Sequence, residues 1–124
     1  LDLKGNSAIY LLYSYARINS ILKKIKEEIY KFENYELSKE EIDLLKILFY
    51  LDVIVLRTIR DLKINRFCSY IFELSKSFNI FYEKCRILDE TENKKFFRLT
   101  ILILLKRIYE FIFDIIGIEK IEKI

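Results

Sequence analysis

The chain has 124 residues, with 22 Lys and Arg against 19 Asp and Glu, which gives a formal net charge of +3. It is 52% hydrophobic and 33% charged, has no proline and has only two glycines, which favours one ordered, helical domain over a disordered chain. Because histidine is absent, imidazole bases and histidine metal ligands are excluded. Two cysteines are too few for a four-ligand zinc site, so we expect no bound metal.

Cys68 and Cys85 form neither a C-x-x-C motif nor a disulfide framework, and we expect both to be reduced, buried thiols. The longest nearly apolar run, residues 99–105 with Thr100 inside it, is much shorter than the ~20 residues that a membrane span needs. We therefore expect a soluble protein with no membrane partner. The chain begins with Leu1 and not Met, which suggests a fragment of a longer protein.

The first expected helix starts after residues 5–7 and runs to about Glu33 and Asn34. Its apolar residues recur at alternating spacings of four and three, which predicts one buried stripe: Leu11, Tyr15, Ile18, Leu22, Ile25 and Ile29. A capping box, Ser38 to Glu41, opens the second helix. Its pattern continues to Leu62, so we expect a break near residues 50–53, although no Pro or Gly marks one.

After a turn at residues 63–65, another helix is predicted with the same spacing, and its core positions are Phe67, Ile71, Leu74, Phe78, Phe81 and Cys85. Asp89 with Glu92, or Thr91 instead, caps the last helix, which should end at Gly117. That helix is apolar nearly all round, so we expect it to be central. The expected fold is an all-α bundle of about five helices.

Two polar stripes lie beside these core positions. At 100° per residue, the first helix places Tyr10, Tyr13, Arg17, Ser20 and Lys24 on one arc, and the later helix places Ser75, Asn79, Tyr82 and Arg86 on another. Aromatic rings accept unstacked bases, and neighbouring guanidinium groups hold phosphates or base edges, so the stripes suit recognition of single-stranded RNA. The alternative is ordinary packing, in which a tyrosine lies at the rim of a core beside a snorkelled cation.

Three short motifs resemble the arginyl-tRNA synthetase family. Residues 5–13 and 15–21 resemble the first helix of its C-terminal anticodon-binding domain, often called DALR. Residues 70–75, with Phe78, Phe81, Tyr82 and residues 85–88, are similar to the middle signature. Arg98-Leu99 and residues 116–118 are similar to the closing helix and C-terminus.

The resemblance implies that the whole chain, 1–124, is a DALR-type domain that binds the anticodon stem-loop of tRNA(Arg). It implies a cytoplasmic parent enzyme, an arginine-tRNA ligase, that joins L-arginine to tRNA with ATP and Mg in a catalytic domain absent from this chain. It assigns Tyr13, Arg17, Tyr82 and Ile124 to the anticodon loop. The chain departs from the family at its end, Lys123-Ile124 where Arg-Met is frequent, and at Asn19, where a basic residue is frequent.

The stripes and the resemblance together give the candidate tRNA-binding residues: Tyr10, Tyr13, Arg17, Lys24, Asn79, Tyr82, Arg86 and Ile124. No catalytic site is expected, because the family's ATP-binding signatures contain His and a Lys-Met-Ser-Lys type loop, and this chain has neither His nor Met. The adjacent carboxylate pairs Glu27/Glu28 and Glu40/Glu41 point about 100° apart on helix surfaces and do not converge as a catalytic pair. Two alternatives remain open. In the first, the chain is a helical interaction domain whose stripes bind protein. In the second, it is the similar domain of another class I synthetase.

Overall fold

The computed structural model describes residues 6–25 and 33–117, and these contain five α-helices. The helices are α1 (Asn6–Leu22), α2 (Lys39–Leu48), α3 (Leu51–Asp61), α4 (Asn65–Lys84) and α5 (Glu92–Ile116). The described part contains no strand, so the expected all-α bundle of about five helices is confirmed. Within that part, no helix is both long and apolar enough to cross a membrane.

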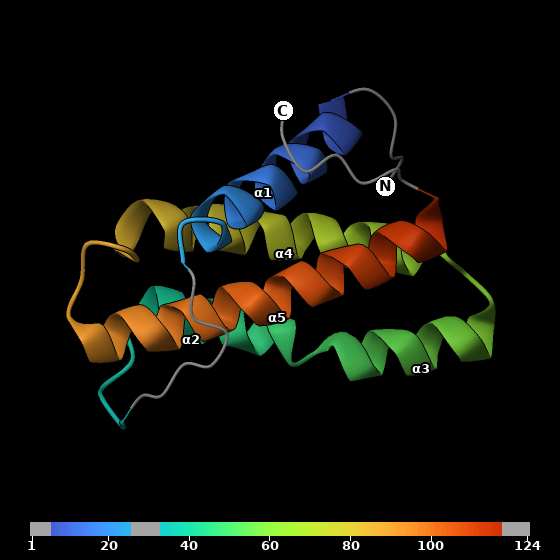
Figure 1. Cartoon of the computed structure of the whole chain (residues 1–124). Helices are drawn as coiled ribbons and strands as arrows, with labels where there is room; N and C mark the ends of the chain where they lie inside the picture. Colours follow the sequence, from blue (N-terminus) through green and yellow to red (C-terminus); the bar gives the residue numbers. More distant parts are fainter. Residues whose placement is uncertain (1–5, 26–32, 118–124) are drawn as a thin grey trace.

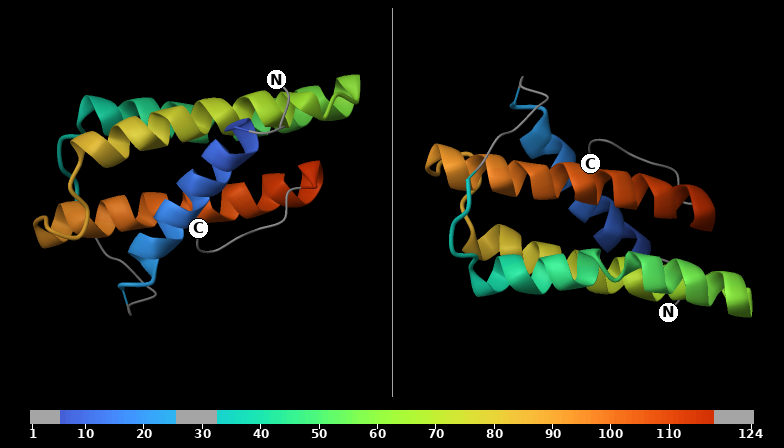
Figure 2. Two further views of the ribbon diagram at one scale, coloured as in Figure 1. Left: turned by 90° about the horizontal axis from the view of Figure 1, so that it is seen from above. Right: turned by 90° about the horizontal axis from the view of Figure 1, so that it is seen from below.

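The bundle is built around α4. Helices α2 and α3 follow one another along one side of α4, and α1 crosses over α4 and α5 on another side (Figures 1 and 2). Helix α4 packs against all four other helices, whereas α5 packs chiefly against α1 and α4. The prediction that the last helix is central was therefore wrong. Its nearly continuous apolar sequence leaves Leu104, Phe111 and Ile115 exposed.

The hydrophobic core contains the apolar stripes that the sequence predicts for α1 and α4. Leu11, Tyr15 and Ile18 of α1 are buried, as are all six predicted core positions of α4. Tyr15 contacts two aromatic rings of α5, with ring centroids 6.2 Å from Tyr109 and 5.6 Å from Phe113. Burial of such rings is the main source of stability for a bundle of this size.

Helix α1 ends earlier than predicted. Its last helical residue is Leu22, and the amides of Lys24 and Ile25 donate to carbonyls three residues back, as in a 3₁₀ turn. Residues 33–38 are not helical, so the predicted end near Glu33 was wrong. The apolar spacing continues past Leu22 without a Pro or Gly, and so the sequence carries no sign of this end. Ile29 lies outside the described residues.

The predicted capping box of α2 is confirmed. Ser38 is the N-cap, its hydroxyl accepts from the Glu41 amide at 3.2 Å, and the Glu41 carboxylate accepts from the Ser38 amide at 2.8 Å. The expected break falls at residues 49–50, and the turn before α4 falls at residues 62–64. Neither the break at residues 49–50 nor the turn at residues 62–64 contains a Pro or Gly.

Of the two N-caps that the sequence offers for α5, Asp89 and Thr91, the structure uses the second. Thr91 is the N-cap, without a side-chain capping bond, and Asp89 makes no capping box with Glu92. Gly117 ends α5 in the left-handed conformation, with φ of 81°, as predicted. Cys68 and Cys85 form no disulfide within the described part of the chain; Cys85 is buried, but Cys68 is only half-buried.

Candidate nucleic-acid interface

The exposed side of α1 carries three of the predicted site residues. Tyr13 is 58% exposed, and Arg17, one turn further along the helix, is also exposed. Tyr10 is half-buried, and its ring packs against Phe72 of α4 with centroids 5.4 Å apart. Tyr10 therefore helps to seat α1 on α4, whereas Tyr13 and Arg17 remain accessible to a ligand.

Helix α4 brings Asn79 and Tyr82 to the same surface. The Arg17 guanidinium carbon lies 4.1 Å from the centroid of the Tyr82 ring, which is cation–π distance. The Arg17 Nη1 also donates to the Asn79 Oδ1 at 2.6 Å. The structure thus joins two stripes that were separated by more than sixty residues in the sequence. We call Tyr10, Tyr13, Arg17, Asn79 and Tyr82 the α1/α4 face.

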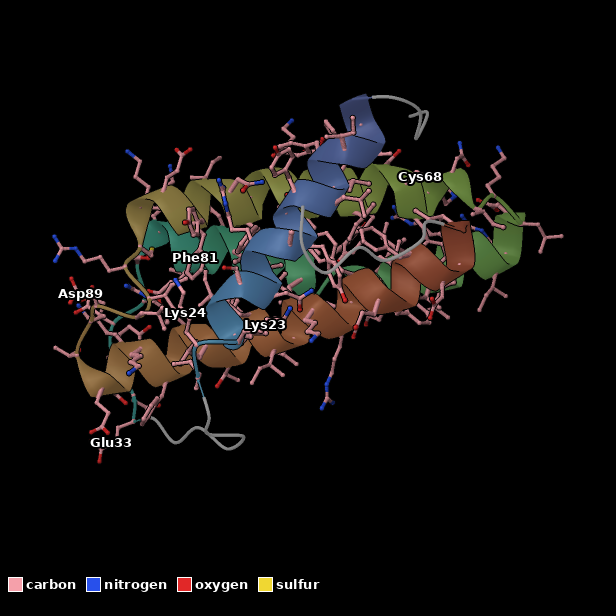
Figure 3. The ribbon with its side chains drawn as sticks, turned by 45° about the horizontal axis from the view of Figure 1, so that its top comes forward. Lys23, Lys24, Glu33, Cys68, Phe81 and Asp89 are labelled. Carbon is pink, nitrogen blue, oxygen red and sulfur yellow. The ribbon has the colours of Figure 1, made fainter. Side chains whose placement is uncertain are left out.

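Two predicted cations lie at one end of this face. Lys24 and Arg86 line a groove of about 430 Å³ together with Tyr82, and its other lining residues are Ile21, Cys85, Ile87, Leu88 and Asp89. Figure 3 shows Lys24 at the end of α1 and Asp89 in the connection that follows α4. Two cations beside an aromatic ring provide both charge for a phosphate and a flat apolar surface for a base.

A buried ion pair supports the same end of the face. The sequence did not predict this pair, and the expectation that Glu41 lies on a helix surface was wrong, because Glu41 is fully buried. The Arg98 Nε donates to the Glu41 carboxylate at 3.0 Å, and both side chains are almost completely buried. The Arg98 Nη1 donates to the backbone carbonyl of Arg86 at 2.7 Å and lies 3.6 Å from the Glu90 carboxylate. Arg98 therefore ties α2 and α5 to the backbone that carries a predicted RNA-binding residue.

The surroundings of Glu41 keep it ionised. Burial by itself raises the pKa of a carboxyl group, but hydrogen bonds from the Arg98 guanidinium and the Tyr35 hydroxyl, with a backbone amide, outweigh that effect. The pKa of Glu41 consequently lies below its ordinary value. The one available signal for this pair was a charged residue, Arg98, next to the core positions of an apolar helix.

Two polar residues named in the sequence analysis, Ser75 and Asn19, are buried. Ser75 is fully buried, so it does not belong to the exposed stripe, whereas Ser20 is exposed. Asn19, which stands where a basic residue is frequent in the family, is only 1% exposed, so its side chain is not accessible to RNA. Ile124 lies outside the described residues, and so its predicted contact stays a prediction.

Known proteins of similar sequence cover nearly the whole chain. The chain is 38% identical over 126 residues to an arginine–tRNA ligase of Nostoc punctiforme, and 37% identical over 127 residues to that of Prochlorococcus marinus. Each alignment covers 99% of this chain but only 22% and 21% of the relative. The chain thus spans about a fifth of the length of the curated relatives it matches.

A solved structure of another protein contains the same fold. The solved Thermus thermophilus arginyl-tRNA synthetase matches with a TM-score of 0.87 and 23% identity, over 99% of this chain and 22% of that one. The fold of this chain is therefore that of an all-α domain within this synthetase. The sequence model of the DALR anticodon binding domain matches residues 11–124. The chain belongs to this family, which confirms the resemblance found in the sequence.

Proposed function

We propose that this chain is the anticodon-binding domain of an arginine–tRNA ligase and that its α1/α4 face binds the anticodon stem and loop of tRNA(Arg). The observation that carries the proposal is the contact of Arg17 with Tyr82, which joins exposed aromatic and cationic groups of two helices. Bases of a single-stranded loop splay out and lie on such groups. Lys24 and Arg86 extend the face with positive charge for the adjoining phosphates.

The parent enzyme, in this proposal, acts in the cytoplasm and joins L-arginine to the 3′ end of tRNA with ATP. Within the described residues, no three Cys, Asp or Glu side chains come together as metal ligands. In this proposal, the ATP–Mg chemistry belongs to a catalytic domain elsewhere in the parent polypeptide. This domain contributes tRNA binding only.

Titration of a labelled anticodon stem-loop of tRNA(Arg) at two salt concentrations tests the proposal. We expect tighter binding than to an unrelated hairpin of equal length, and an affinity that falls steeply with salt because phosphate contacts release counterions. Equal affinity for both hairpins would contradict the proposal. Weak, salt-independent RNA binding would favour the alternative, a helical domain that binds protein.

The same titration on two charge variants locates the site. Arg86→Gln should weaken binding and reduce the salt slope by about one, because one phosphate contact is lost. Arg57→Gln is the matched control, since Arg57 lies on α3, on the other side of the bundle from α1 (Figure 1). A loss of affinity in Arg57→Gln that equals the loss in Arg86→Gln would place RNA binding away from the α1/α4 face.

A further inference from the structure

Asn79 makes hydrogen bonds at both ends of its side-chain amide. Its Oδ1 accepts from Arg17 at 2.6 Å. Its Nδ2 lies 2.9 Å from the Ser75 carbonyl, 2.9 Å from the Ser14 hydroxyl and 3.1 Å from the Tyr10 hydroxyl. Two amide hydrogens thus face three acceptors, and no donor of Asn79 is left for RNA.

These partners also define which way the amide points. The Ser75 carbonyl only accepts and the Arg17 guanidinium only donates, so the nitrogen of Asn79 must face Ser75 and its oxygen must face Arg17. A reversed amide would place two acceptors together and two donors together. The orientation that holds Arg17 is therefore imposed by the surrounding groups.

The polar contacts continue from Asn79 into the core. The Ser75 hydroxyl donates to the Ile71 carbonyl at 2.7 Å, so the buried Tyr109 hydroxyl of α5 is the donor in its contact with Ser75. Burial raises the pKa of Tyr109, which keeps that proton in place. Groups from α1 and α4 thus meet around the Asn79 amide, and Ser75, which binds that amide through its carbonyl, joins Tyr109 of α5 through its hydroxyl. The exposed Arg17 is anchored to the bundle through Asn79.

Arg17 covers one face of the Tyr82 ring. Phe78 lies near the same ring, with centroids 6.2 Å apart and planes tilted by 46°. A ligand that approaches over Arg17 consequently meets the guanidinium before it meets the tyrosine. A guanidinium is planar and delocalised, and it stacks on nucleobases as well as on aromatic side chains.

From this geometry we infer that Asn79 is a positioning residue: it holds the Arg17 guanidinium over Tyr82, and an unpaired nucleobase of the bound RNA stacks on the outer side of that guanidinium. The inference rests on the proposed function and specifies what Arg17 binds, a base and not a phosphate. Asn79, a candidate RNA contact in the sequence, acts through Arg17 instead.

The positioning part is tested without RNA, by NMR of the chain. The Tyr82 ring current should shift the side-chain protons of Arg17 upfield. Asn79→Ala should reduce that shift, whereas Asn34→Ala, the same change at an exposed loop residue, should leave it unchanged. Random-coil shifts for Arg17 in the unaltered chain, or an undiminished shift in Asn79→Ala, would overturn the positioning role.

The base-stacking part is tested with anticodon stem-loops that carry 2-aminopurine at one loop position at a time. Stacking on Arg17 should quench the fluorescence at one of these positions. Arg17→Lys keeps the charge but loses the planar group, so it should abolish that quenching and lower affinity about tenfold, with an unchanged salt slope. Arg57→Lys, a change at another guanidinium near a tyrosine ring, 5.7 Å from the Tyr50 centroid, is the control.

The outcomes separate this inference from the proposed function. Quenching retained in Arg17→Lys, or a reduced salt slope without loss of quenching, would show that Arg17 binds phosphate and would overturn base stacking. Failure of the unaltered chain to prefer the tRNA(Arg) hairpin would overturn the proposed function and base stacking together. The RNA-free NMR measurement would still decide whether Asn79 positions Arg17.

Discussion

The Arg98 guanidinium of α5 and the Glu41 carboxylate of α2 form an ion pair in the interior, with Nε and Oε2 3.0 Å apart. Glu41 is at the same time the last residue of the capping box of α2. Arg98 also binds the backbone of Arg86, next to the candidate RNA-binding groove. This one buried ion pair therefore connects the first turn of α2, the hydrophobic core and the edge of the α1/α4 face.

Glu41→Gln should destabilise the fold by about 3–5 kcal/mol at neutral pH, because it leaves the Arg98 charge buried without its partner. Chemical denaturation followed by circular dichroism measures this loss. Glu73→Gln is the matched control, since Glu73 is an exposed residue of α4 and should change stability by less than about 0.5 kcal/mol. Equal stabilities of the two variants would show that the pair contributes little.

The same pair predicts a pH dependence with a defined sign. The pKa of Glu41 is lower in the folded state than its ordinary value of 4.5, so the unfolded state binds a proton more readily. The stabilisation is complete above pH 4.5 and is lost as the pH falls through the lower, folded pKa. Melting temperatures of the unaltered chain should fall more steeply below pH 4.5 than those of Glu41→Gln. Parallel curves would contradict the prediction.

Local signals in the sequence predicted most of the helices. The Ser38–Glu41 capping box and the Gly117 end of α5 are both confirmed, because each depends on residues close together in the chain. The early end of α1 at Leu22 and the central place of α4 were missed. Both depend on which helices pack together, and apolar periodicity records only that a face is buried, not against what.

For the candidate site, too, the sequence predicted the positions within each helix but not the contacts between helices. Helical periodicity placed Tyr13 and Arg17 on one stripe and Tyr82 on another, but it could not show that Arg17 would lie on Tyr82. The buried pair of Arg98 with Glu41 spans 57 positions of sequence, and no spacing rule connects such residues. Contacts between distant segments emerge only from the packing of the whole bundle.

Tyr13→Ala should weaken binding of the anticodon stem-loop by about 1–3 kcal/mol, because one aromatic surface for a base is lost. Tyr13 is 58% exposed, so the melting temperature should hardly change. Tyr13→Phe keeps the ring and should retain most of the affinity. A large drop in melting temperature with normal RNA affinity would show instead that Tyr13 serves packing.

Two leucine-to-alanine substitutions should differ sharply in how much they lower the stability of the fold. Leu74 of α4 is fully buried, whereas Leu56 of α3 is 68% exposed. Leu74→Ala should cost about 2–5 kcal/mol, because it removes packed apolar atoms and leaves a cavity. Leu56→Ala should stay within about 0.5 kcal/mol of the unaltered chain. Urea denaturation measures both, and a comparable loss at Leu56 would show that the exposed apolar side of α3 is covered in solution.

Two helices end in the left-handed conformation, one with a glycine and one without. Gly117 ends α5 with φ of 81°, and Leu62 ends α3 with φ of 56°. Among residues 6–25 and 33–117, nothing lies within 4 Å of a Cβ built at Gly117, and the Leu62 side chain is 86% exposed. We therefore expect Gly117→Ala and Leu62→Gly to change packing little. Backbone strain should therefore decide how a substitution at either position changes the stability of the fold.

Gly117→Ala should destabilise the fold by about 1–2 kcal/mol, the usual cost of the left-handed region for a residue with a Cβ. Leu62→Gly should do the reverse and stabilise it by up to about 1 kcal/mol, because relief of strain exceeds the added freedom of the unfolded chain. Gly117→Asn should lie between glycine and alanine, since asparagine tolerates this conformation. Thermal unfolding of the three variants measures the order. If Leu62→Gly lowers the melting temperature, entropy of the unfolded chain outweighs strain at the end of α3.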